Sequence, residues 1–133
     1  MKYIYLYIIT FVVFLAIDFI WLNFIAKNIY ATKIGHLLAE NPKLFPALIF
    51  YLVFIVGVII FAVLPGYEAQ NIWKTVMLGA LFGFLTYSTY DLTNLATLKN
   101  WPVSVTIIDL IWGTSISTVT SVAGYYIAMA LKL

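Results

Sequence analysis

Cysteine and arginine are absent from this chain, and charged residues of any kind are scarce. Without cysteine, the chain can form neither disulfides nor thiolate metal sites. Charged residues make up only 9% of the 133 residues, and the net charge of +2 comes entirely from lysine. So weak a basic excess is not the footprint of a nucleic-acid-binding surface, and we expect no nucleic-acid partner.

What the chain has instead is apolar: 65% of its residues are hydrophobic and 18% are aromatic. A soluble domain is about 45–50% apolar and about 25% charged. A chain of this size cannot bury such an apolar excess inside itself. Aromatic residues in this proportion suit the two interfaces of a bilayer. The composition therefore predicts an integral membrane protein whose main partner is the lipid bilayer.

Four apolar runs are each long enough to cross a membrane, which takes about 20 residues. They lie at about residues 3–26, 46–64, 72–90 and 103–131. Backbone polar groups in lipid must be satisfied within the segment, so these runs are predicted to be helices, and none alternates like a barrel strand. The predicted fold is an all-α bundle of four transmembrane helices, forming one integral membrane domain over residues 1–133.

The flanks of the apolar runs carry further signals. The first run is too long for the core of a signal peptide, and no small-residue cleavage site follows it, so we expect it to be retained. Pro65-Gly66 is predicted to end the second helix. Between the first two runs, apolar positions recur at helical spacing, which predicts a short interfacial helix at about residues 29–40. The lysines divide almost evenly between the two sides, so the positive-inside rule determines no orientation.

Three of the five acidic residues, Asp18, Asp91 and Asp109, lie in or at the ends of the predicted spanning helices. A carboxylate near the bilayer centre costs about 2.5–3.5 kcal/mol on insertion scales, so it faces protein or water. The helix directions and a rise of about 1.5 Å per residue put all three in the same half of the membrane. We therefore predict that they converge in one polar pocket, where at least one is protonated or a cation lies between them.

A short repeat places an indole next to two of these carboxylates. The segment from Ile17 to Trp21 reads IDFIW, and the segment from Ile108 to Trp112 reads IDLIW. Helices 1 and 4 are predicted to be antiparallel, so each indole N–H can serve a carboxylate across their interface. Helical facing adds a tyrosine and an asparagine beside the third carboxylate. The candidate binding pocket comprises Asp18, Asp91, Asp109, Trp21, Trp112, Asn94 and Tyr87.

Small residues form a second kind of pattern. Gly79 and Gly83 lie one helical turn apart in the third run, and Gly113 and Ser117 share a face of the fourth. Both faces suit close packing of helices in lipid. One small bundle can hardly use both and still enclose a pathway, so we expect a homo-oligomer.

The stretch from Tyr90 to Pro102, YDLTNLATLKNWP, resembles a family of bacterial membrane proteins grouped as domain of unknown function 2177. The resemblance covers essentially the whole chain. Further matching positions are Asp18, Trp21, Tyr30, Phe50, Tyr51, Gly57, Phe61, Pro65, Asp109, Trp112 and Gly113. The resemblance implies a multi-pass protein of the bacterial cytoplasmic (inner) membrane. It implies no activity, cofactor or catalytic residue.

Three functions remain open from the sequence. The leading hypothesis is a transporter or channel for a small solute, a cation or protons, because intramembrane carboxylates exchange protons or hold hard cations. The second is a lipid-binding or lipid-modifying enzyme or accessory. No motif for nucleophilic, zinc or phosphate chemistry is present, so we favour a non-enzymatic role with no cofactor and no metal. The third is a non-catalytic scaffold whose carboxylates only hold the helices together.

Overall fold

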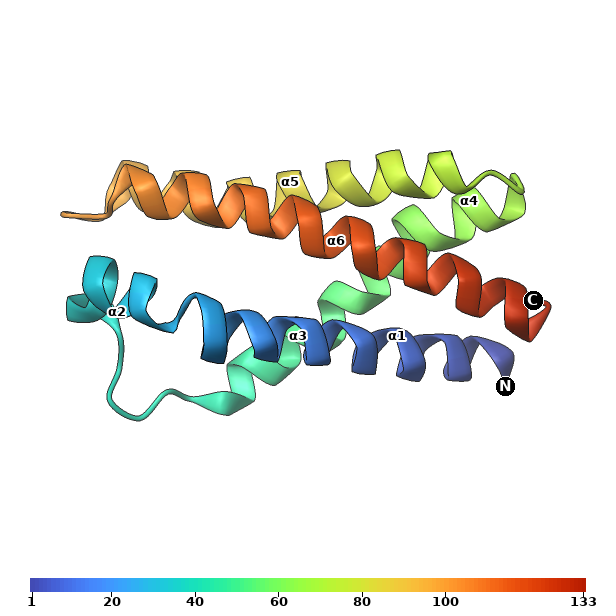
Figure 1. Ribbon diagram of the computed structural model, residues 1–133, viewed down its shortest axis with the longest axis horizontal. Helices are drawn as coiled ribbons and strands as arrows, with labels where there is room; N and C mark the ends of the chain where they lie inside the picture. Colours follow the sequence, from blue (N-terminus) through green and yellow to red (C-terminus); the bar gives the residue numbers. More distant parts are fainter.

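The computed structural model describes residues 1–133, and it contains helices and no strands. The chain forms four long helical segments joined by turns and short helices. In Figure 1 the first and the last two run along the longest axis of the molecule, and the second crosses the view obliquely. The first is α1 (Lys2–Ile20), which continues as the π-helical turn η1 (Trp21–Ile25). The last two are α5 (Ile72–Thr97) and α6 (Val103–Leu131).

The second long segment combines three elements: α3 (Leu44–Val58), the π-helical turn η3 (Ile59–Val63) and α4 (Leu64–Glu68). A short helix, α2 (Lys27–Ile34), and the 3-10 turn η2 (Gly35–Leu37) lie between the first and second long segments.

Three of the four long segments are long and apolar enough to cross a membrane: Lys2–Ile25, Leu44–Glu68 and Val103–Leu131. The fourth, α5, has 26 residues, but polar side chains from Thr86 to Asp91 lower its hydropathy. Large apolar side chains cover the outside of the molecule, as expected for helices that meet lipid. The protein is therefore all-helical with three candidate membrane spans, and the fourth span remains a prediction.

The prediction that Pro65-Gly66 ends the second helix is wrong. The helix continues through Pro65 to Glu68, and the chain turns at Gln70, whose φ is 53°. Pro65 lies in the first turn of α4, immediately after the π-helical turn. At the first turn of a helix the missing proline N–H costs little.

Two other predicted boundaries also differ from the structure. The third apolar run ends near residue 90, but α5 remains helical to Thr97. Its last turns are polar, so an apolar-run criterion misses them although the backbone remains helical. The segment predicted as one helix at residues 29–40 is α2 followed by a 3-10 turn that ends at Leu37.

The main core lies between α1, the α3–η3 segment and α6. Leu6, Phe14, Ile55, Val58 and Ile116 form its centre and are almost completely buried. Burying side chains of this size stabilises a soluble protein by about 1.5–3 kcal/mol each. In lipid the same contacts act mainly through close van der Waals packing.

Glycines allow α5 and α6 to approach closely. A Cβ atom at Gly83 would lie 2.3 Å from the backbone oxygen of Gly113, and a Cβ at Gly113 would lie 2.1 Å from Cγ of Tyr87. Gly79 faces the Ser121 side chain in the same interface. The two small-residue faces therefore pack against each other within one chain. Oligomerisation itself remains a prediction.

The two chain termini lie at one end of the molecule (Figure 1). There Lys2 Nζ donates a hydrogen bond to the backbone oxygen of Lys132 at 3.1 Å. At the opposite end, Ile34 of α2 packs with Trp101 and Val105, next to the turn between α5 and α6. This opposite end holds the candidate site.

Candidate functional site

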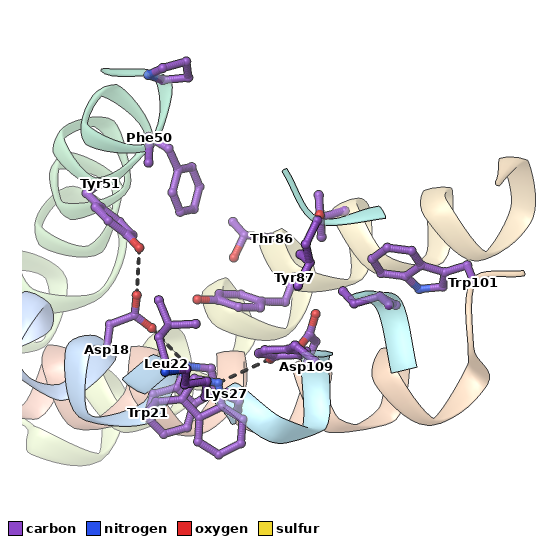
Figure 2. A pocket seen from close by; sticks show the side chains of 17 residues that line it. Asp18, Trp21, Leu22, Lys27, Phe50, Tyr51, Thr86, Tyr87, Trp101 and Asp109 are labelled. Atoms are coloured by element: carbon purple, nitrogen blue, oxygen red, sulfur yellow. Dashed lines mark hydrogen bonds between the residues drawn. The ribbon is translucent and has the colours of Figure 1, made fainter. Parts of the chain in front are cut away.

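A cavity of about 870 Å³ lies between α1, η1, α2, α3, α5 and α6. Twelve of its 17 lining residues are hydrophobic, and the charged ones are Asp18, Asp109 and Lys27. Figure 2 shows Asp18 and Asp109 on different elements of the cavity wall, with the Tyr87 ring between them in this view. The volume is within the range of small-molecule sites, which is about 300–1,000 Å³. The cavity therefore combines an apolar interior with two carboxylates.

Asp18 joins three helical segments. Its Oδ2 accepts a hydrogen bond from the Tyr51 hydroxyl of α3 at 2.9 Å, drawn as a dashed line in Figure 2. Its Oδ1 accepts a hydrogen bond from Trp112 Nε1 of α6 at 3.3 Å. Asp18 lies in the last turn of α1, which continues as the π-helical turn η1, and such turns are frequent at functional sites. Both carboxylate oxygens thus have a donor although the side chain is only 7% exposed.

The two tryptophans of the sequence repeat meet face to face. The rings of Trp21 and Trp112 are stacked, with centroids 4.3 Å apart and planes 8° from parallel. Trp112 donates directly to the carboxylate of the other repeat segment. Trp21 reaches Asp109 indirectly, because its Nε1 donates to the Tyr30 hydroxyl at 3.3 Å. Each tryptophan of the repeat is therefore linked to the aspartate of the other repeat segment. Trp112 is hydrogen-bonded to Asp18 directly, and Trp21 is linked to Asp109 through the Tyr30 hydroxyl.

Tyr30 of α2 donates its hydroxyl proton to Asp109 Oδ1. Burial, and then the hydrogen bond to Asp109, raises the pKa of Tyr30 above its ordinary value. The phenol therefore stays protonated and remains a donor at any pH the protein meets. This contact brings α2 against the site, although α2 is separated from Asp109 by most of the chain.

Asp91 lies behind the cavity wall rather than in it. It is fully buried, and neither of its carboxylate oxygens has a hydrogen-bond partner. Its side chain lies beside that of Asp109. Two adjacent carboxylates cannot hydrogen-bond to each other unless one carries a proton. A proton on one of the two carboxyl groups would supply that hydrogen bond and give the Asp91 oxygens a partner.

The structure separates the predicted pocket into two groups. Five of its seven residues line the cavity: Asp18, Asp109, Trp21, Trp112 and Tyr87. Asp91 and Asn94 do not line it. Asp91 nevertheless lies beside Asp109, and the convergence of all three carboxylates in one pocket remains a prediction. The three also form no cluster of the kind that holds a metal ion.

Three important cavity residues were missed as site residues: Tyr30, Tyr51 and Lys27. The two tyrosines provide the donors to the carboxylates. They lie 79 and 33 positions from their partners, so helical facing within one segment could not pair them. Both are among the positions that carry the family resemblance, and this was the one available signal. No feature of the sequence indicated that Lys27 would line the cavity.

The arrangement suits a ligand with a basic or hydrogen-bond-donating head and an apolar body. The carboxylates retain free lone pairs, since each oxygen can accept more than one hydrogen bond. The aromatic side chains of Trp21, Tyr87 and Phe50 line the same space. A cation over such faces is stabilised by about 0.5–2 kcal/mol.

Comparison with known proteins gives one match. The model of a family described as predicted membrane protein (DUF2177) matches residues 3–126. No curated protein matches the chain. No solved structure matches it either.

Proposed function

This chain belongs to the DUF2177 family of predicted membrane proteins, and we propose, from the chemistry of its cavity, that it is a membrane carrier that exchanges an amphipathic, basic solute for protons. The observation that carries this proposal is the cavity in which two nearly buried carboxylates, Asp18 and Asp109, stand in a mostly apolar wall. Such carboxylates inside a membrane helix are costly and mark ion or substrate sites. We place the protein in the bacterial cytoplasmic membrane, as the family resemblance implies.

The carrier is proposed to cross the membrane four times. A helix of 26 residues is about 39 Å long at 1.5 Å per residue, enough for a hydrocarbon core of about 30 Å. α5 packs closely along α6, a candidate span, so the two helices share one depth in the bilayer. α2 is too short and too polar to cross, and we propose that it lies in the interface above the cavity.

The carboxylates define the class of solute. Tyr51 and Trp112 donate to Asp18, and Tyr30 donates to Asp109, so the hydrogen-bond donors to both carboxylates are neutral groups. The one cationic side chain that lines the cavity is Lys27, at an exposed position. Burying an unpaired negative charge is expensive, so a solute that brings a positive charge binds with an advantage. The aromatic and apolar walls select a solute whose remaining surface is hydrophobic.

The Asp91–Asp109 pair is the proposed proton site. When the cavity is empty, one proton is shared between the two carboxyl groups. When the basic solute binds against Asp109, its charge replaces that proton, which leaves to the aqueous side. Binding of the solute and of the proton is then mutually exclusive, which is the requirement for exchange.

Proteoliposomes with an imposed pH gradient test this function. The probe is ethidium, a fluorescent aromatic cation, and the readout is gradient-driven uptake that a protonophore abolishes. Asp109→Asn keeps shape and hydrogen bonding but removes the charge. We expect uptake to fall at least about tenfold, the equivalent of about 1.4 kcal/mol. Glu68→Gln is the matched control, since Glu68 is exposed and lies outside the cavity. Equal uptake by the Asp109→Asn and Glu68→Gln proteins would refute the proposal.

The second candidate function is a structural scaffold. It is favoured by one observation: Asp18 links α1 to both α3 and α6 through its two hydrogen bonds. In that case Asp18→Asn, which still accepts hydrogen bonds, should leave the protein folded and its biological role intact. Asp18→Leu should destabilise the bundle, because it leaves the Tyr51 and Trp112 donors without an acceptor.

A further inference from the structure

A second cavity, of about 620 Å³, lies on the outer side of α1 facing α3. Seven of its nine lining residues are hydrophobic. Val12 and Phe19 on this surface are 56% and 60% exposed, so in a bilayer it faces acyl chains. We call this second cavity the lateral groove.

The lateral groove and the carboxylate cavity share a wall. Asp18, Leu22 and Tyr51 line both. Two of the three are joined by the hydrogen bond from the Tyr51 hydroxyl to Asp18 Oδ2, seen at the cavity edge in Figure 2. The cavity and the lateral groove therefore adjoin at these three side chains. A passage from the lipid into the cavity would run past Tyr51 and Leu22.

The charges around the carboxylate cavity are of both signs. Asp18 and Asp109 lie in its wall, and Lys27 lines it from the start of α2, where the lysine is exposed. A ligand that complements this pattern carries a cation that reaches the carboxylates and an anion that stays near Lys27. A lysine ammonium is a common partner for phosphate oxygens.

We infer that the cavity admits, from the bilayer through the lateral groove, a phospholipid with a primary amine in a zwitterionic headgroup. The amine would donate to Asp18 or Asp109, the phosphate would lie at Lys27, and an acyl chain would occupy the groove. A primary amine fits better than a quaternary one, because carboxylates accept hydrogen bonds that only N–H groups can donate. This inference rests on the proposed function only in taking the cavity to be a ligand site.

Photo-crosslinking tests the inference. The full-length protein is placed in phosphatidylglycerol vesicles with a trace of photoactivatable phosphatidylethanolamine, and labelling is competed with unlabelled lipids. Unlabelled phosphatidylethanolamine should compete at least about tenfold better than phosphatidylcholine, as expected for one charge-assisted hydrogen bond. Equal competition by these two lipids would overturn the inference.

Two variants locate the lipid. Ala16 is exposed and lines the groove, so Ala16→Trp should fill it and reduce labelling severalfold. Lys27→Gln, at an exposed position, should also reduce labelling by removing the phosphate partner. Val119→Trp is the control, since Val119 is 52% exposed on α6 and lines neither cavity. If the Ala16→Trp and Lys27→Gln proteins are labelled as strongly as the control, the lipid binds elsewhere and the inference fails.

The lipid inference and the carrier proposal fail separately. If ethidium uptake depends on Asp109 but labelling shows no lipid preference, the carrier function is supported and phospholipid binding is refuted. If labelling is selective for phosphatidylethanolamine but the Asp109→Asn substitution does not change ethidium uptake, the cavity is a lipid-binding site and proton exchange is refuted.

Discussion

At the scale of single residues, the chemistry of this site depends on which donors reach which carboxylate. Asp18 has two donors, from Tyr51 and Trp112. Asp109 has one, Tyr30, and Asp91 has none. The number of hydrogen-bond donors therefore falls from two at Asp18 to one at Asp109 and none at Asp91. A buried polar group without a partner needs an explanation, and a proton between Asp91 and Asp109 would provide one.

The Tyr30→Phe substitution tests the hydrogen bonds through the Tyr30 hydroxyl without changing the shape of the cavity wall. The change removes the donor to Asp109 and the acceptor of Trp21 Nε1, and it leaves the ring in place. Leaving buried polar groups unsatisfied costs about 1–3 kcal/mol, so thermal stability in detergent should fall measurably. Tyr126→Phe is the control, because Tyr126 is 55% exposed and lies outside the cavity. Equal melting temperatures for the two variants would mean that the Tyr30 contact contributes no stability.

At the scale of elements, the bundle depends on how closely α5 can approach α6. The approach is set by backbone rather than side chains at Gly83, which faces the carbonyl of Gly113. The same contact places the Tyr87 ring over Gly113 and so positions one wall of the cavity. Close packing at these glycines therefore determines the shape of the site as well as the stability of the helix pair.

Gly83→Ala should force the two helices apart, because a Cβ would lie 2.3 Å from a backbone oxygen that cannot rotate away. Overpacking of this kind costs about 1–3 kcal/mol or more. We expect a clear loss in unfolding free energy, measured by titration with SDS. Gly35→Ala should have little effect, since nothing lies within 4 Å of a Cβ at Gly35. A Gly83→Ala protein as stable as Gly35→Ala would contradict this account of the interface.

At the scale of the whole molecule, the arrangement of the long segments determines how many times the chain crosses the membrane. Both termini lie at one end (Figure 1), as an even number of crossings requires. The turns before α5 and after it lie at opposite ends of the molecule. The apolar character of α5 alone is too low to decide whether it spans, so its packing against α6 is the stronger argument.

Cysteine accessibility decides the fourth span. Because the chain has no cysteine, a single substitution provides a unique label site. Gln70→Cys and Asn100→Cys flank α5, and a membrane-impermeant maleimide applied to sealed vesicles should label only one of them. Labelling of both from the same side would show that α5 does not cross, and would reduce the protein to three spans.

Much of the architecture follows from local properties of the sequence. The length and hydropathy of a run depend only on its own residues, so the membrane class and the positions of the long helices follow from them. With only five acidic residues in the chain, Asp18 and Asp109 stand out as candidates for the site. The helix at Pro65 and the polar end of α5 were predicted wrongly, because backbone hydrogen bonding continues where composition changes.

Only the tertiary structure decided how the helices are rotated and which side chains meet. Rotation about a helix axis depends on all neighbouring helices at once, so facing within one segment could not show that Asp91 stands behind the cavity. It also could not pair Tyr51 with Asp18 or Tyr30 with Asp109, because those contacts join distant segments. The apolar runs determined that this chain belongs in a membrane. Packing determined that two of its carboxylates line one cavity and that the third lies buried beside Asp109.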